Sequence, residues 1–373
     1  MTSTIEAYQS NGGARIYRIP LELFPILSGY AHLVFTDDII ALIDVGSGFG
    51  ESNDQLEEGM KEIHSRYGEL ATWEDLTHVL ITHGHIDHFG GLPYVRDRTE
   101  AKIGIHELDL RVLANFEERL KIVEHRLRVY LVEAGVEVNK REGIMTLYML
   151  NKHLYSSLAP DFTYDSVGMR LGPFRIFHVP GHCPGHVVIQ LDDVLFSGDH
   201  VLKKTTPHQA PESLSLNTGL GHYLESLRLV RRLSDEIHLV LGGHEGPIYD
   251  LGDRIREIES LHLDRLEQIL DLLKEPLTVA QISHALFPEV EGYHELLALE
   301  EAGAHVEYLV QRGYLGIDNL DELNFESPAP IRYKRTEGTG RLEVTFNAEH
   351  PEPAIASEGI SLANPSPLSS DGC

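Results

Sequence analysis

The segment THGHIDHFGG, residues 82–91, places three histidines and one aspartate within six positions. Neutral imidazole and carboxylate groups are ligands that Zn²⁺ and iron take in proteins. His83 and His85 are two residues apart, so both can face one ion from a turning loop. Asp87 and His88 fall on the next turn and face elsewhere. The segment therefore offers two pairs of ligands, unless it is an accidental histidine-rich loop.

Three further segments place a potential ligand just after an apolar strand. They are VPGHCPGH with His182, LFSGDH with Asp199 and LGGHEGP with His244. The glycines in these segments allow the backbone to approach a ligand closely. Because histidine or aspartate follows the end of a strand each time, the pattern favours a metal site over an accidental loop.

The order of these motifs, together with Asp44 in LIDVG, resembles the metallo-β-lactamase fold superfamily over about residues 15–250. The resemblance implies an α/β fold, an αββα sandwich with its ligand loops at one edge of the sheets. It also implies the ligand set: His83, His85 and His182 for a first metal ion, Asp87, His88 and His244 for a second, and Asp199 as the bridge between them.

Other residues near these motifs have weaker assignments. The resemblance gives Asp44 the role of a non-ligand aspartate that braces the metal loop, and the alternative is a turn former at a strand end. His200 follows Asp199 and is expected beside the ligands, with a merely packed histidine as the alternative. His186 and Cys183 lie close to His182, but the family pattern assigns the ligand position to His182 alone.

Two divalent ions would lower the pKa of a shared water toward about 7 and so generate hydroxide. The resemblance therefore implies a hydrolase whose nucleophile is a metal-bridging hydroxide. Asp87 and Asp199 are the candidate catalytic residues, because either could orient that hydroxide. Zinc is the expected metal, with iron or manganese as alternatives, since His and Asp ligands suit all three. His88 stands where many zinc β-lactamases carry arginine, so antibiotic hydrolysis is not expected.

The fold hosts several chemistries, so other features must indicate the substrate. The leading expectation is a small-molecule acyl thioester or a related ester. Single-strand RNA endonucleases share the fold, but the formal net charge of −27 disfavours a nucleic-acid partner, although RLVRR at 228–232 could form a basic strip. Acyl-homoserine lactonases usually carry tyrosine soon after the bridging aspartate, where this chain has His200, Val201 and Leu202. A non-catalytic metal-binding sensor would have little reason to keep all seven ligands.

The strands that hold these loops are predicted from short apolar or β-branched runs closed by turn residues. They are 31–35, 39–46, 76–81, 101–106, 174–179, 187–191, 194–198 and 237–243, with helices at 51–66 and 221–233. A helical insertion at about 107–160 interrupts them and carries an apolar stripe at spacings of three and four: Leu113, Phe116, Leu120, Val123, Leu127 and Tyr130. We expect most of the stripe to pack on a partner helix at 145–154, with a pocket wall or a homodimer contact as alternatives.

The pattern predicts a catalytic domain at 1–252, a small helical domain at 253–325 and a mobile tail at 326–373. The helical end is similar to that of the lactamase-beta-like group of the superfamily, which implies a winged-helix-like domain at 253–325. Thr278 and Gln281 have capping-box spacing, and IRYKRTEGTGRLEVTF in the tail could close a hairpin. No run approaches the roughly 20 apolar residues of a membrane helix, and the N-terminus lacks the features of a secretion signal. We therefore expect a cytoplasmic protein without a membrane partner.

Overall fold

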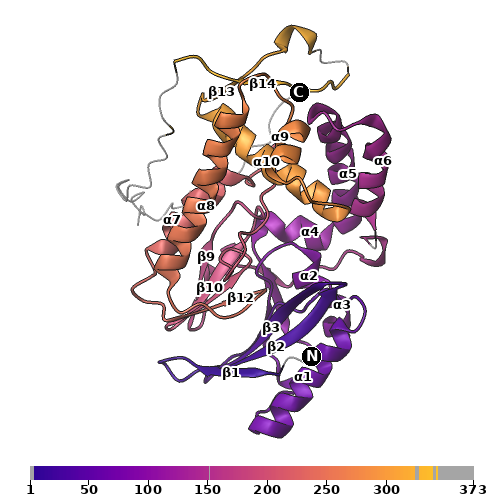
Figure 1. The fold of residues 1–373 in the computed structure, drawn as a ribbon. Helices are drawn as coiled ribbons and strands as arrows, with labels where there is room; N and C mark the ends of the chain where they lie inside the picture. Colours follow the sequence, from indigo (N-terminus) through magenta and orange to yellow (C-terminus); the bar gives the residue numbers. More distant parts are fainter. Residues whose placement is uncertain (1–3, 151, 324–326, 339–341, 343–373) are drawn as a thin grey trace, which may run out of the picture. The chain divides into compact units, whose positions relative to one another are not determined.

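Two mixed β-sheets form the centre of the computed structural model, which describes residues 4–150, 152–323, 327–338 and 342 (Figure 1). The first sheet has its strands in chain order: β1 (Glu6–Gln9), β2 (Arg15–Phe24), β3 (Leu27–Phe35), β4 (Ile40–Ile43), β5 (His78–Leu80), β6 (Lys102–Ile105) and β7 (Phe162–Thr163). The second has the order β12 (Leu239–Gly242), β11 (Val194–Gly198), β10 (Val187–Leu191), β9 (Phe174–His178) and β8 (Arg170–Leu171). Strands β4 to β7 are parallel, as are β11 and β12, and the other neighbours are antiparallel.

Apolar side chains cover both faces of the first sheet. In β4, Ala41 and Ile43 belong to the core between the sheets, together with Ile176 and Phe196 of the second sheet. Leu42 belongs instead to the core on the outer side, because successive strand residues point to opposite faces. Central strands with two buried faces are continuous apolar runs, which is why the sequence pattern found them.

Helices flank the two sheets on their outer sides. Helix α1 (Ser52–Tyr67) contacts β2 and buries Leu56, Met60 and Ile63 against the first sheet. Helices α7 (Leu220–Arg231) and α8 (Leu251–Leu272) lie beside the second sheet (Figure 1). The αββα layering predicted from the sequence is therefore confirmed.

Strands β1 and β2 are not among the predicted strands, although β2 is ten residues long. Its sequence, RIYRIPLELF, contains a proline and two arginines, which are atypical of a central strand. Strand β1 pairs only with residues 15–18, so Pro20 lies beyond its end and has a strand partner on one side only. Arg18 is fully buried, and its guanidinium lies 3.3 Å from the centroid of the Tyr30 ring.

Between β6 and β7 the predicted helical insertion is present as α4 (Leu110–Ala114), α5 (Phe116–Glu133) and α6 (Val138–Met149). The apolar stripe is not one continuous helix, because the chain breaks at Asn115, whose φ and ψ of −135° and 45° are not helical. The partner helix α6 begins and ends earlier than the predicted range 145–154. Leu127 and Tyr130 are buried, in agreement with a packing role for most of the stripe.

The C-terminal part of the described chain consists of α8, α9 (Val279–Leu286) and α10 (Tyr293–Gln311), followed by an antiparallel ribbon of β13 (Leu315–Ile317) and β14 (Tyr333–Arg335). The capping box of Thr278 and Gln281 is present at the start of α9. These elements belong to the same compact unit as the sheets, Met1–Glu343. A separate domain at 253–325 and its likeness to a winged helix stay predictions.

The prediction of a mobile tail from residue 326 onward is wrong at residues 333–335. Residues 333–335 form β14, and the Tyr333 backbone also exchanges hydrogen bonds of 2.8 and 3.0 Å with Leu277. A lone three-residue run carries no periodicity, so its pairing with distant segments has no sequence signal. The hairpin expected across EGTG falls partly outside the described residues.

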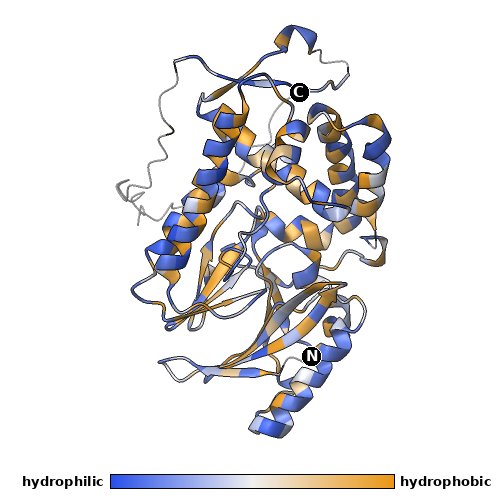
Figure 2. Cartoon of the chain, viewed as in Figure 1, coloured by the Kyte–Doolittle hydropathy of each residue, from blue (hydrophilic) through white to orange (hydrophobic). Residues whose placement is uncertain are grey.

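Figure 2 shows polar and apolar residues alternating along the helices, as expected for helices with one buried face. Within the described chain, none of the helices combines the length and apolar character needed to cross a membrane.

Candidate metal centre

Loops at the ends of the central strands carry the residues that the sequence analysis singled out. Strands β4 and β5 are parallel neighbours, as are β11 and β12, so the loops after each pair leave the sheet at one edge. The residues and the strands they follow are Asp44 (β4), His83 and His85 (β5), His182 (β9), Asp199 (β11) and His244 (β12), while Asp87 and His88 lie in the short helix α2 (Ile86–Phe89).

The structure brings the seven predicted ligands into two adjoining groups. In the first group, the ring centroid of His83 lies 4.8 Å from that of His85 and 5.1 Å from that of His182. Cys183 lies within reach of these rings, but burial raises the pKa of its thiol well above the usual value. Since the thiolate is the form that binds metal, Cys183 remains the poorer ligand.

The second group consists of Asp87, His88, Asp199 and His244. His244 Nε2 lies 3.3 Å from Asp87 Oδ2 and 3.4 Å from Asp199 Oδ2, and His88 Nε2 lies 3.4 Å from Asp199 Oδ1. Ligand atoms bound at 2.0–2.1 Å to a tetrahedral ion lie about 3.3 Å from one another. The spacing in this group therefore suits a bound cation.

Asp199 contacts both groups. Its Oδ2 atom lies 3.8 Å from His182 Nε2 in the first group, and its two oxygens face His88 and His244 in the second. This is the geometry expected of the bridging ligand.

Hydrogen bonds hold the imidazoles with Nε2 toward the centre. His88 Nδ1 donates to Asp44 Oδ2 at 2.8 Å, His182 Nδ1 to the His208 carbonyl at 2.7 Å, and His244 Nδ1 to the Ser28 carbonyl at 2.7 Å. A proton fixed on Nδ1 leaves the lone pair on Nε2, which is the form that binds metal.

Buried polar atoms without hydrogen bonds mark the same point. They include the Nε2 atoms of His83, His88 and His182 and the Oδ1 atom of Asp199. Buried polar groups are nearly always paired, so atoms that converge in this way indicate a bound partner. The donor set of imidazoles and carboxylates therefore fits divalent metal ions.

The electrostatics of the two groups differ. Burial holds the pKa values of His83 and His85 well below the usual value, so both are neutral lone-pair donors. Burial also opposes the charge of His88 and His244, but Asp199 with the other carboxylates raises their pKa values to about 10 and about 12. The aspartates thus create a strongly negative field, which a divalent cation would neutralise.

Asp44 contacts the metal loop directly. Its Oδ1 accepts from the Thr82 amide and its Oδ2 from the Thr82 hydroxyl and His88, each at 2.8 Å. Its backbone is in the left-handed region, at φ 57°, which aspartate tolerates better than most residues. These contacts are those of a residue that braces the ligand loop.

His186 and His200 lie near the centre in different ways. The His186 ring stacks on His83 at 4.4 Å, and its Nε2 accepts from the Asp199 amide at 3.1 Å. His200 is buried one step further away, with its ring against Tyr223 at 5.1 Å. His186 therefore supports His83 and Asp199 directly. The His200 ring lies 5.9 Å from the His186 ring, and its role beside the ligands stays a prediction.

Asp109 is a site residue that the sequence analysis missed. Its fully buried carboxylate accepts from the Gly84 amide at 2.8 Å and from the Gly185 amide at 3.0 Å. It therefore ties the loop of His83 and His85 to the loop of His182. A single aspartate at the start of a helical insertion carries no signal for this role.

Side chains from the insertion and from α10 lie near the metal centre. Burial raises the pKa of Tyr155 to about 12, and the charge of Asp87 adds to that effect. Burial lowers the pKa of Lys152 to about 8, against the opposing charges of Glu300 and Asp87. The Tyr155 hydroxyl donates to the Ser47 carbonyl at 2.9 Å, in the loop that follows Asp44, so the end of the insertion borders the site.

Comparisons with known proteins agree with this geometry. The model of the Metallo-beta-lactamase superfamily matches residues 25–244. The "Probable metallo-hydrolase YqjP" of Bacillus subtilis (strain 168) is 25% identical over 284 residues, which is 73% of this chain and 85% of that protein. A hydroxyacylglutathione hydrolase of Shewanella sp. (strain ANA-3) is 30% identical over 152 residues, which is 39% of this chain and 45% of that protein.

Two solved structures share the fold over most of the chain. The metallo-beta-lactamase family protein TTHA1429 from Thermus thermophilus has a TM-score of 0.65 at 25% identity and covers 86% of this chain and 98% of its own. A beta-lactamase domain protein from Burkholderia ambifaria has a TM-score of 0.66 at 22% identity and covers 89% and 94%.

Proposed function

The chain belongs to the metallo-β-lactamase superfamily as a metal-dependent hydrolase, and we propose that it cleaves an acyl thioester or a related ester at a dinuclear metal site. The observation that carries the hydrolytic part is the convergence of buried, unpartnered ligand atoms on Asp199. The thioester part is supported by the 30% identity to a hydroxyacylglutathione hydrolase.

Metal ions bound here would polarise the acyl carbonyl and lower the pKa of water to about 7. The protein's own residues determine how the reactants are arranged. Asp87 faces His88 and His244 through Oδ2, so its Oδ1 can accept a hydrogen bond from the attacking water and direct the water's lone pair at the carbonyl carbon. Asp199, whose two oxygens face histidines of both groups, would position that water by holding the ions. Attack forms the new C–O bond, the C–S bond breaks, and the proton from water ends on the leaving thiolate. Zinc is the proposed metal, with iron or manganese as alternatives.

A cation beside the centre supports an anionic thioester carrier. The Lys152 ammonium lies 4.3 Å from the centroid of the Tyr148 ring, near enough to Asp87 and Glu300 to feel both charges. Both thiol carriers are anionic: glutathione carries carboxylates, and coenzyme A carries phosphates at the far end of its pantetheine arm. We propose that Lys152 faces such a group.

An RNA substrate has less support. The formal net charge is −27, and Arg231 of the RLVRR segment pairs with Glu259 on α8 at 3.0 Å. That arginine faces a neighbouring helix, so it adds little to a basic strip. A lactone substrate has no specific observation in its favour.

The test is thiol release from acyl-glutathione and acyl-coenzyme A thioesters by protein loaded with zinc, iron or manganese. His182→Ala and Asp199→Ala should lose turnover and bound metal, whereas His284→Ala, which removes an exposed histidine from α9, should keep both. Equal turnover by His182→Ala and the unaltered protein would overturn the site assignment. Cleavage of lactones or single-stranded RNA, with no thiol release, would overturn the thioester assignment alone.

A further inference from the structure

The carbonyl that orients His182 belongs to a segment with little structure of its own. Residues 201–219 lie between β11 and α7 and form no helix or strand; an isolated bridge joins Thr218 to Gly181. Arg254 of α8 donates to the carbonyls of Leu202 and Thr205 at the start of this segment. Within this segment, the His208 carbonyl accepts the His182 Nδ1 proton at 2.7 Å. The orientation of the His182 imidazole therefore depends on whatever holds the segment in place.

Carboxylates of α10 hold this segment at successive points. Glu300 Oε2 lies 3.0 Å from the side-chain Nε2 of His208. Glu301 Oε2 accepts from the Gln209 amide at 2.8 Å. Further along, Glu307 Oε2 accepts from the Glu212 amide at 2.6 Å. We call Glu300, Glu301 and Glu307 the α10 clamp.

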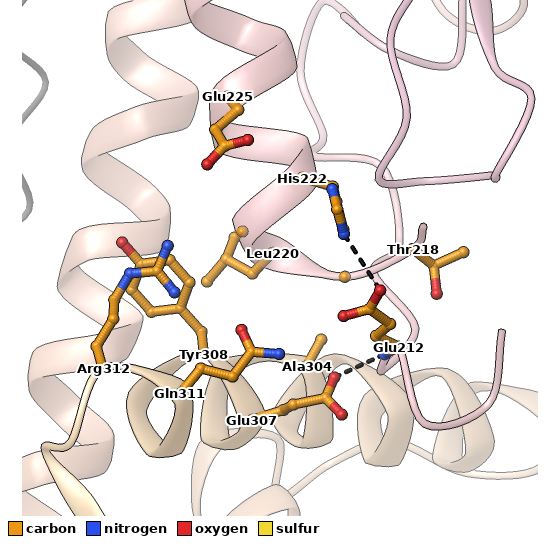
Figure 3. Close-up of a pocket in the computed structure, with 12 residues that line it drawn as sticks. Glu212, Thr218, Leu220, His222, Glu225, Ala304, Glu307, Tyr308, Gln311 and Arg312 are labelled. Carbon is orange, nitrogen blue, oxygen red and sulfur yellow. Dashed lines mark hydrogen bonds and ion pairs between the residues drawn. The ribbon is translucent and has the colours of Figure 1, made fainter. Parts of the chain in front are cut away.

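Figure 3 shows the far end of this arrangement, around a cavity of about 120 Å³ between α7 and α10. Glu307 points its carboxylate at the Glu212 backbone, and His222 of α7 lies 3.3 Å from the Glu212 side chain. At Glu212 the segment is thus held between two helices. At His208 and Gln209 the carboxylates of α10 hold it, and the His208 carbonyl also bonds His182.

The clamp is itself firmly placed. Glu301 is only 7% exposed, and its Oε1 pairs with Arg265 of α8 at 2.5 Å. The backbone carbonyl of Glu301 accepts from His305 Nδ1 at 2.7 Å, and His305 Nε2 lies 3.0 Å from His262 Nδ1 on α8. Burying a carboxylate is costly unless it is paired, and Arg265 supplies that pair, while the His305 hydrogen bond fixes the Glu301 backbone.

We propose that Glu300 and Glu301 are positioning residues for the first metal ion, acting through His208 on His182. They touch neither metal nor substrate. Gln209 is fully buried, so without Glu301 its backbone N–H would have no acceptor, and the segment would shift until this N–H found another one. A shifted His208 carbonyl would no longer hold the His182 ring in its ligand orientation, and support of this kind is worth about 10–100-fold in metal affinity. The inference rests on the metal site of the proposed function but not on its thioester substrate.

Metal affinity of the full chain tests this inference separately from turnover. Co²⁺ titration, followed by the visible absorption of the bound ion and by competition with a chelator, reports on each site. We expect Glu301→Leu to weaken one of the two sites about 10–100-fold. Glu301→Gln keeps an acceptor oxygen for the Gln209 amide and should stay within about threefold of the unaltered protein. Glu300→Leu should weaken the same site as Glu301→Leu.

Glu295→Leu is the matched control, because it removes a carboxylate from α10 whose partner is Lys140, away from the segment. Its Co²⁺ affinity and spectrum should be unchanged. The inference is overturned if Glu301→Leu binds two ions with normal affinity, or if Glu295→Leu loses as much affinity as Glu301→Leu. If Glu301→Leu fails to fold, the Co²⁺ affinity of Glu300→Leu is compared with that of Glu301→Gln and Glu295→Leu. Equal affinity in the three variants then overturns the inference. Normal Co²⁺ binding by the unaltered protein without thioester turnover would count against the proposed function only.

Discussion

Asp44 shows how much of the site depends on one residue that binds no metal. Its two oxygens accept from Thr82 and His88, and its left-handed backbone turns the chain at the end of β4. The Thr82 hydroxyl, which donates to Asp44, also lies 3.1 Å from His83 Nδ1. One carboxylate therefore influences a ligand in each metal group.

Asp44→Asn should weaken metal binding by about 10–100-fold. Asparagine tolerates the left-handed backbone, but its amide has one acceptor oxygen, so either Thr82 or His88 meets an NH₂ group. Competition with a chromophoric chelator measures the affinity. Asp37→Asn, in an exposed turn, is the control and should bind metal normally. Unchanged affinity in Asp44→Asn would contradict the bracing role.

Lys152 gives a prediction that depends on pH. Burial lowers its pKa to about 8, so the side chain is charged below that pH and loses its charge above it. The KM for an acyl-glutathione substrate should therefore rise between pH 7 and pH 9, while the KM for an uncharged thioester should not. Lys152→Arg keeps its charge and should flatten the rise. A flat KM in the unaltered protein would exclude Lys152 as the anion-facing group.

At the scale of elements, the insertion and α10 approach each other closely. The Tyr130 hydroxyl of α5 donates to the Leu299 carbonyl of α10 at 3.0 Å. Gly303 on α10 makes this possible, because a Cβ atom there would lie 2.0 Å from Tyr130 Oη and 2.9 Å from Pro211 Cγ. Pro211 belongs to the segment that the α10 clamp holds. The insertion, α10 and the segment 201–219 are therefore packed as one body around Gly303.

Gly303→Ala should destabilise the protein by about 1–3 kcal/mol, since the added methyl group overpacks a buried contact. Gly143→Ala on α6 is the matched control, because its Cβ atom meets nothing within 4 Å. Alanine is the better helix former, so that variant should be more stable by about 0.8–1 kcal/mol. Denaturant midpoints measure both. Equal midpoints for the two variants would mean that α10 and the insertion separate easily.

At the scale of the whole molecule, the metal centre concentrates charge that folding alone does not favour. The chain has a net charge of −27, and Asp87 and Asp199 lie in its interior, within 4 Å of His244. Metal ions bound only by the folded chain would stabilise it by mass action. The ligand loops come from both sheets, so ions bound at the centre would also link the two sheets.

Chelation should lower the melting temperature of the metal-loaded protein. Each site contributes about 2.7 kcal/mol when the free metal concentration is one hundred times its Kd. Thermal unfolding with and without chelator measures the effect. Asp199→Ala, which removes the bridging ligand, should show a much smaller response. A melting temperature of the unaltered protein that ignores the chelator would argue against bound metal.

Much of the fold could be predicted because its central strands have two apolar faces. β4, β5, β10 and β11 are short apolar runs. The ligands His83 and Asp199 follow β5 and β11 closely, and the bracing Asp44 follows β4. β2 could not be predicted, because Arg18 and Pro20 hide its pattern and only the end of β1 and the Tyr30 ring explain their presence. The break at Asn115 and the pairing of β14 could not be predicted either, because both depend on segments that are distant in the sequence.

The sequence by itself determined which residue types stand at the strand ends, and hence the two groups of histidines and aspartates. Only the tertiary structure decided how those side chains are held. The partners of His182 and His244 are the carbonyls of His208 and Ser28, and the former depends on α10. Every residue has a backbone carbonyl, so no residue type marks the one that will orient a ligand. Only folding places that carbonyl beside the ligand.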